Sequence, residues 1–185
     1  MTVKSDSKPI PETFNQQFEE SVRRFPDRVA FRLKTPGGYP TTTYREAHRQ
    51  AVGVASGLLA LGLKHGSRVA ILSENRPEWV IAYLGIYLAG MVAVPLDIQI
   101  SPREWRRLIE DSDARTVFAS GLLLDKLREE VKDFRPPLRI VSFDPVSGDR
   151  DARTELAGLI DWAEELSPAP QIPECTPSDL SLIHI

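Results

Sequence analysis

The chain has 185 residues, 42% of them hydrophobic and 26% charged, which is enough to bury the core of one domain or of a large part of one. Its formal net charge is −3 and its basic residues are interleaved with acidic ones, so a nucleic-acid-binding protein is disfavoured. Only Trp105-Arg106-Arg107 approaches a basic patch. The single cysteine, Cys175, excludes an internal disulfide framework and a multi-cysteine metal site, and we interpret it as an incidental thiol in a reducing cytoplasm.

The first 44 residues predict a flexible start, a helix and a hairpin. Residues 1–12 are polar and contain proline, without the apolar segment of a secretion signal. Residues 13–24 place apolar side chains at a period of four, which indicates a helix with one apolar face; they are Phe14, Phe18 and Val22. Residues 29–34 and 39–44 flank the turn-forming sequence Thr-Pro-Gly-Gly, so we expect a two-stranded hairpin.

Two capping boxes predict the starts of two further helices. In each, a hydroxyl side chain precedes a glutamate by three positions, so that each side chain can bond the other residue's backbone N–H. The first box is Thr43 with Glu46, opening a long amphipathic helix that stops at Gly62. The second is Ser101 with Glu104, and its helix should bury Trp105, Leu108 and Ile109.

Four short apolar, β-rich runs predict strands at residues 68–73, 91–96, 115–119 and 138–143. Helices separate them: residues 79–88, apolar almost all round and stopped by Gly90, then the capped helix and residues 122–132, with residues 156–165 as the last helix. Strands separated by helices need crossover connections, so we expect an α/β fold with a mostly parallel sheet and helices on both faces. The most hydrophobic segment of the chain, residues 79–89, is shorter than the ~20 residues of a membrane span and should be core.

This alternation sets the expected domain boundaries. Residues 13–166 form one α/β subdomain, and the proline-rich residues 167–179 form a linker or surface loop.

Ligands of doubly wound sheets gather beyond the carboxyl ends of the strands, and this gives the candidate site residues. They are Ser73, Glu74, Asn75 and Arg76 after the first of the four strands, and Asp97, Ile98 and Gln99 after the second. Arg76 could meet an anion there. We favour the plainer interpretation, in which Asn75 and Glu74 cap the helix start and Arg76 is solvated.

Other reactive side chains have plainer explanations. His48 and His65 have no ligand-spaced partner, so neither is expected to bind metal or act as a base. The acidic runs should be solvated helix ends; they are Asp111 to Asp113, Glu129-Glu130 and Glu164-Glu165. Trp79, Tyr83 and Tyr87 form an aromatic row at four-residue spacing. We interpret this row first as core packing and only second as part of a wall for an acyl chain.

The run RVAILSENRPEWVIAYLGIYLAGMVAVPLD, with its flanking segments, resembles the N-terminal part of the AMP-forming acyl-CoA synthetases of the adenylate-forming superfamily. Its ENRPEWVIAYLGI wording is most similar to the long-chain fatty acid ligases. The resemblance covers residues 13–179. It implies a parent enzyme that forms an acyl-adenylate from ATP and a fatty acid, then transfers the acyl group to CoA, with Mg as a further cofactor. It also implies a cytoplasmic protein, with peripheral membrane contact left open.

The family's catalytic motifs have no matching position within residues 1–185, and the sequence contains no Gly-rich loop that could cradle phosphates. We therefore assign no catalytic, cofactor-binding or metal-binding residue, and expect the fragment itself to be inactive and to bind ATP poorly. An amino-acid- or aryl-acid-activating enzyme of the same superfamily remains an alternative. So do a non-catalytic α/β binding module and, less favoured without a Gly-rich turn, a small nucleotide-binding protein.

The last six residues, LSLIHI at 180–185, interrupt the resemblance. They read like the translation of an adapter used in preparing sequencing libraries, and we expect them to be non-native. A genuine truncated product is the alternative, and the DNA downstream of codon 179 would distinguish the two.

Overall fold

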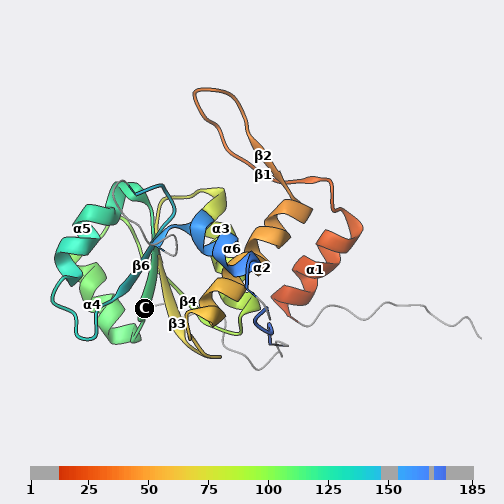
Figure 1. The fold of residues 1–185 in the computed structure, drawn as a ribbon. Helices are drawn as coiled ribbons and strands as arrows, with labels where there is room; N and C mark the ends of the chain where they lie inside the picture. Colours follow the sequence, from red (N-terminus) through yellow and green to blue (C-terminus); the bar gives the residue numbers. More distant parts are fainter. Residues whose placement is uncertain (1–12, 147–153, 167–168, 174–185) are drawn as a thin grey trace, which may run out of the picture.

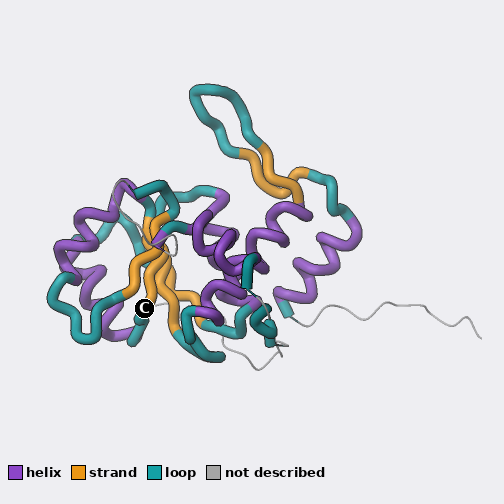
Figure 2. The backbone as a smooth tube through the Cα atoms, in the orientation of Figure 1, coloured by secondary structure: helices purple, strands orange, loops and turns teal. Residues whose placement is uncertain are grey.

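The computed structural model describes residues 13–146, 154–166 and 169–173. Helix α1 (Phe14–Arg24) begins at a capping box between Thr13 and Gln16. Strands β1 (Val29–Arg32) and β2 (Thr41–Thr43) pair antiparallel, which confirms the predicted hairpin. This hairpin projects from the body of the molecule, and its loop extends beyond the two short strands (Figures 1 and 2).

A four-stranded sheet forms the centre of the described residues. Its strands are β3 (Arg68–Leu72), β4 (Val92–Pro95), β5 (Thr116–Ala119) and β6 (Arg139–Ser142), in the order β4-β3-β5-β6. All neighbouring pairs are parallel, so the predicted parallel sheet is confirmed. The apolar runs are explained by burial on both faces, since a parallel sheet is covered by helices on each side.

The helices form one layer on each face of the sheet (Figure 1). Helices α2 (Tyr44–Ala60), α3 (Pro77–Leu88) and α6 (Leu156–Glu164) share one apolar core with Val69 and Ile71. Helices α4 (Pro102–Ser112) and α5 (Gly121–Val131) share a second core with Ala70 and Leu72. Residues of β3 therefore alternate between the two cores, because successive side chains of a strand point to opposite faces of the sheet. Helices on both faces were predicted, with boundaries that differ by one or two residues.

Both predicted capping boxes are formed. The Thr43 N–H donates to Glu46 Oε2 at 2.7 Å, and the Ser101 N–H donates to Glu104 Oε2 at 2.8 Å. These hydrogen bonds from the backbone, and those from the two hydroxyls, lower the pKa of each glutamate below its ordinary value. Both helices therefore start where local sequence alone places them.

Glycines set the distances within the α2, α3 and α6 layer. A Cβ added at Gly85 would lie 2.5 Å from the Val54 side chain, and one added at Gly57 would lie 2.6 Å from that of Leu159. Such separations are shorter than van der Waals contact. Gly85 therefore lets α3 approach α2 closely, and Gly57 does the same for α6.

Several predictions fall wholly or partly on residues that the structure does not describe. The flexible start at 1–12, Cys175 and the tail at 180–185 lie outside the described residues. Of the expected linker at 167–179, only residues 169–173 are described; they form neither helix nor strand, and Ile172 packs against the core of α2, α3 and α6.

Candidate functional site

The strand order places a switch point at the carboxyl edge of the sheet. From β3 the chain moves to β4 on one side and then returns past β3 to β5 on the other. The intervening helices change faces accordingly, since α3 lies on one side of the sheet and α4 on the other. Loops diverge at such a point, and a crevice forms where open α/β sheets bind their ligands.

A groove of about 730 Å³ lies at this edge, between the loops that follow β3 and β4. It is lined by Ser73, Glu74, Asn75, Trp79, Pro95, Leu96, Asp97, Ile98, Gln99, Ile100 and Leu108. Six of the seven residues predicted from the strand ends line it together. Six of these lining residues are apolar, and the charged lining residues are both carboxylates, Glu74 and Asp97. The groove therefore does not suit a polyphosphate.

Arg76 is the seventh predicted residue, and it lies among three carboxylates. Its guanidinium donates to Glu78 at 2.8 Å and to Asp144 at 2.8 Å, and lies 3.6 Å from Glu74. The guanidinium carbon also lies 5.7 Å from the centre of the Phe143 ring. Only 18% of the side chain is exposed, so the expectation that Arg76 is solvated is wrong.

The helix start is also different from the expectation. Arg76 itself is the N-cap of α3, and no side chain caps that helix. Asn75 and Glu74 instead face the groove, so the prediction that they cap α3 is wrong. The physical reason is Pro77, whose fixed φ favours the first helical position and whose missing N–H needs no cap there.

Asp144 joins this edge to the second helix layer. One oxygen of its carboxylate, Oδ2, accepts from Arg76 and also from the Gly121 N–H at the start of α5, at 2.7 Å. The hydrogen bond from Arg76 and that from Gly121 lower the pKa of Asp144 against the opposing effect of burial. Burial alone lowers the pKa of Arg76, but the hydrogen bonds to Asp144 and Glu78 raise it above its ordinary value.

Asp144 was missed because it lies 68 positions from Arg76. A signal was nevertheless available, since Asp144 follows the fourth strand as Asp97 follows the second. The strand-end rule that selected 73–76 and 97–99 would have included it. Nearby, the Oγ of Ser120 is buried without a hydrogen-bond partner in the described part of the chain.

The predicted aromatic row runs from the groove along α3. Trp79 and Tyr83 stack with ring centres 5.5 Å apart, and Tyr83 and Tyr87 follow at 6.3 Å. Phe14 of α1 meets both tyrosines edge-on, at 6.1 and 5.8 Å. The row therefore fastens α1 to α3, which is a packing role, and burial raises the pKa of Tyr83.

The remaining candidates take structural roles. His48 lies 5.9 Å from the Phe18 ring, and His65 packs against Gly90. No cluster of three or more His, Cys, Asp or Glu suited to a metal ion occurs within the described ranges. Exposed acidic side chains at helix ends form ion pairs, as with Arg107–Asp111, Arg115–Asp113, Lys132–Glu129 and Arg49–Glu164.

The basic sequence at 105–107 does not form a basic patch. Trp105 is buried, and its indole N–H donates to the Asp97 carbonyl at 2.8 Å. Arg106 pairs with Glu110 and Asp133 and lies over the Phe134 ring. In the part of the chain that the structure describes, no helix has both the length and the apolar character needed to cross a membrane.

Comparison with known proteins agrees with this architecture. A sequence model of the AMP-binding enzyme family matches residues 18–184. The chain belongs to that family.

Relatives within the family carry names that refer to different substrates or products. The long-chain-fatty-acid–CoA ligase FadD15 of Mycobacterium bovis is 33% identical over 149 residues, covering 78% of this chain and 24% of the relative. A linear gramicidin synthase protein of Brevibacillus parabrevis is 36% identical over 113 residues, covering 61% and 1%. The chain thus spans about a quarter of the ligase and a far smaller share of the synthase.

A solved structure shows the same fold. The benzoate CoA ligase from Burkholderia xenovorans LB400 superimposes with a TM-score of 0.75 at 22% identity, over 91% of this chain and 32% of that one. At this identity the likeness supports the fold alone.

Proposed function

We propose that this chain is the N-terminal part of an AMP-forming ligase that activates a carboxylic acid with ATP and Mg and transfers it to CoA. We propose a long-chain fatty acid as the substrate of the complete enzyme. The fatty acid would displace pyrophosphate from ATP to give an acyl-adenylate, and the CoA thiol would then displace AMP.

The observation that carries the proposal is the similarity to the fatty acid ligase, 33% over 149 residues, within a family match that spans residues 18–184. The similarity includes α3 and the residues on either side of it, and the sequence of this segment resembles that of the fatty acid ligases. Amino-acid activation remains the second candidate because the gramicidin synthase protein is 36% identical over a shorter stretch. Aryl-acid activation is kept with it, because the 3-hydroxybenzoate–CoA ligase of Aromatoleum sp. (strain CIB) is 32% identical over 105 residues.

The residues of the sheet edge and its helices supply a scaffold for this reaction. ATP phosphates need backbone N–H groups or cations that face them, whereas the groove at the carboxyl edge presents Glu74 and Asp97. Arg76, the cation of the loop between β3 and α3, is already paired with three carboxylates. We therefore route no step of the ATP chemistry through these residues.

Substrate-dependent exchange of pyrophosphate into ATP by the complete enzyme tests the proposal. Palmitate, benzoate and phenylalanine represent the three acid classes, and CoA is then added to detect the acyl-CoA product. Palmitate should give the highest kcat/KM and should require CoA for product formation.

The outcomes separate the candidates. A higher kcat/KM for benzoate or phenylalanine would move the enzyme to the aryl- or amino-acid-activating group. Absence of exchange with every acid would leave a non-catalytic α/β module. Residues 1–185 alone should show no exchange. Robust pyrophosphate release from them would contradict the proposal that these residues supply only a scaffold.

A further inference from the structure

The groove at the carboxyl edge has an apolar lining to which the proposed ligase function gives no role. Its six apolar lining residues are Trp79, Pro95, Leu96, Ile98, Ile100 and Leu108. All of them except Leu96 are at least partly exposed, and Ile98 is 38% exposed. The volume of about 730 Å³ lies within the range of cavities that hold small organic ligands. The groove can therefore hold the apolar body of a small molecule.

Two neighbouring strands each bring a carboxylate to this groove. Strands β3 and β4 are paired in parallel, with Ile71 opposite Pro95. Glu74 lies three positions beyond Ile71, and Asp97 lies two positions beyond Pro95. Neighbouring strands are about 4.8 Å apart, so the two carboxylates follow adjacent strand ends. Asp97 Oδ1 also accepts from the Gln99 N–H at 2.8 Å, which restrains this side chain at the groove.

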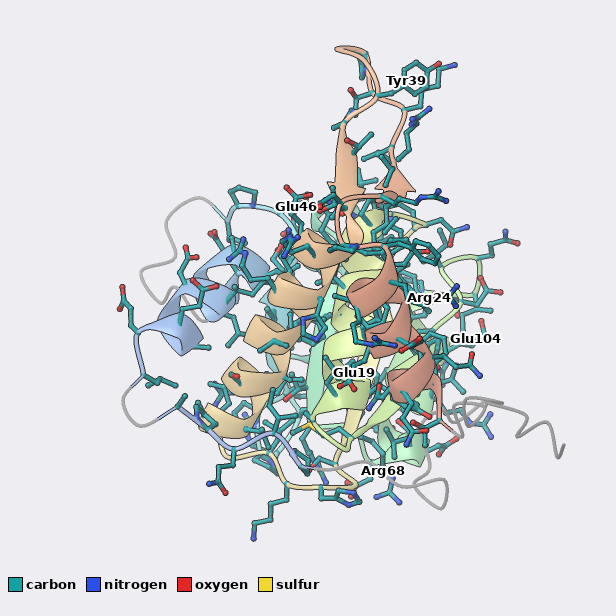
Figure 3. All side chains as sticks on the ribbon, turned by 90° about the vertical axis from the view of Figure 1, so that its right-hand side faces the viewer. Glu19, Arg24, Tyr39, Glu46, Arg68 and Glu104 are labelled. Carbon is teal, nitrogen blue, oxygen red and sulfur yellow. The ribbon has the colours of Figure 1, made fainter. Side chains whose placement is uncertain are left out.

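No basic side chain offsets these carboxylates among the described residues that line the groove. Arg76 lies 3.6 Å from Glu74, but its two closer partners, both at 2.8 Å, are other carboxylates. One guanidinium thus faces three carboxylates, and excess negative charge remains. The one basic residue of β3 and β4 is Arg68, at the amino end of β3, and it lies at the end of the molecule opposite Tyr39 (Figure 3). The groove therefore favours a positively charged ligand.

We propose that the groove binds a small organic ammonium ion with an apolar body. The ammonium has three N–H donors for the carboxylates of Glu74 and Asp97, and such charge-assisted hydrogen bonds are stronger than neutral ones. The indole of Trp79 lines the same groove and attracts a cation at its ring face. The apolar residues then cover the body of the ligand. This binding is independent of the proposed ligase function.

Titration of the 185-residue chain with 2-phenylethylammonium, followed by NMR, tests the proposal. We expect a Kd of about 0.1–1 mM for a probe of this size. 2-Phenylethanol has the same body without the charge and should bind about tenfold more weakly, and 3-phenylpropanoate should not bind. The chain has three tryptophans, and the indole N–H signal that is lost in Trp79→Phe reports on the groove. This signal should shift with the amine, and added salt should weaken the binding.

Matched variants separate the groove from the overall charge of the chain. Glu74→Gln combined with Asp97→Asn should lower the affinity about tenfold, because both partners of the ammonium lose their charge. Asp125→Asn combined with Glu165→Gln is the control. It removes one Asp and one Glu carboxylate at exposed positions, in α5 and at the C-cap of α6, and should leave the affinity unchanged. Circular dichroism should show both double variants folded.

Four results would overturn the proposal. The first is no shift of the Trp79 signal with the amine, and the second is equal binding of 2-phenylethanol. The third is an equal loss of affinity in the groove and control variants. The fourth is tighter binding of a lysine tripeptide, which would assign the groove to a basic protein segment. Should the groove double variant unfold, Asp97→Asn alone decides, and unchanged affinity in that variant contradicts the proposal.

Discussion

The two helix layers cover the same sheet by different means. In the layer of α2, α3 and α6, glycines bring helices so close that an added Cβ would overlap a neighbour. In the layer of α4 and α5, large side chains fill the space, with Trp105, Ile109 and Leu127 buried against the sheet. Substitutions should therefore fail by crowding in the first layer and by leaving cavities in the second.

The largest effect is expected where a large side chain is lost. Trp105→Ala should lower the free energy of unfolding by about 3–5 kcal/mol, because it leaves a cavity and removes a hydrogen bond to the Asp97 carbonyl. Trp105→Phe keeps most of the volume and should cost less. Chemical denaturation of the chain measures both. A loss below about 1 kcal/mol for the alanine variant would mean that α4 collapses onto the sheet, contrary to a rigid, well-filled layer.

Crowding should appear in a double-mutant cycle between α2 and α6. Gly57→Ala should cost about 1–2 kcal/mol, since overlap with Leu159 outweighs the better helix propensity of alanine. Leu159→Ala removes the overlapping atoms, so the double variant should lose about 1–2 kcal/mol less than the sum of the singles.

Gly37→Ala is the control for that cycle. Its added Cβ would meet only the Thr35 hydroxyl, at 4.0 Å, so stability should scarcely change. Strict additivity between Gly57 and Leu159 would contradict close helix contact as the cause.

A smaller and pH-dependent effect is expected where the two layers meet at the carboxyl edge. Asp144 has a lowered pKa, so its interactions with Arg76 and Gly121 stabilise the fold above the ordinary carboxyl pKa and are lost as the pH falls. Asp144→Asn should cost about 1 kcal/mol at neutral pH, a value kept low because the side chain is partly exposed. The difference from the unmodified chain should shrink as the pH falls below the ordinary carboxyl pKa of about 4. A difference that is constant with pH would show that the charge of Asp144 does not contribute.

The smallest effects should be the same in both layers. Thr43→Ala at α2 and Ser101→Ala at α4 should each cost about 0.5–1 kcal/mol, since each removes one N-cap side chain from the same kind of box. Thermal or chemical denaturation can compare the two. Unequal losses would show that the surrounding layer, and not local geometry, sets the value of a cap.

The strands, the hairpin and the two capped helices could be predicted because their signals are local. Strand residues follow one another as β-rich apolar runs, and each capping box lies within four positions. The groove was predicted through a topological rule, since parallel strands bring their carboxyl ends to one edge, and this grouped Ser73 to Asn75 with Asp97 to Gln99. The expected environment of Arg76 was wrong. A single cation in a loop is expected to be solvated when the sequence does not show which carboxylates it contacts.

The sequence by itself determined the order of helices and strands, the parallel sheet and the family resemblance, because periodicity, capping and turn residues act over a few positions. Only the tertiary structure decided which distant residues meet. Arg76 and Asp144 come together because β3 and β6 end at the same edge, and Gly57 meets Leu159 because α6 returns to α2 across one face of the sheet. Such contacts depend on chain topology and on the shapes of several elements at once, which no local pattern records.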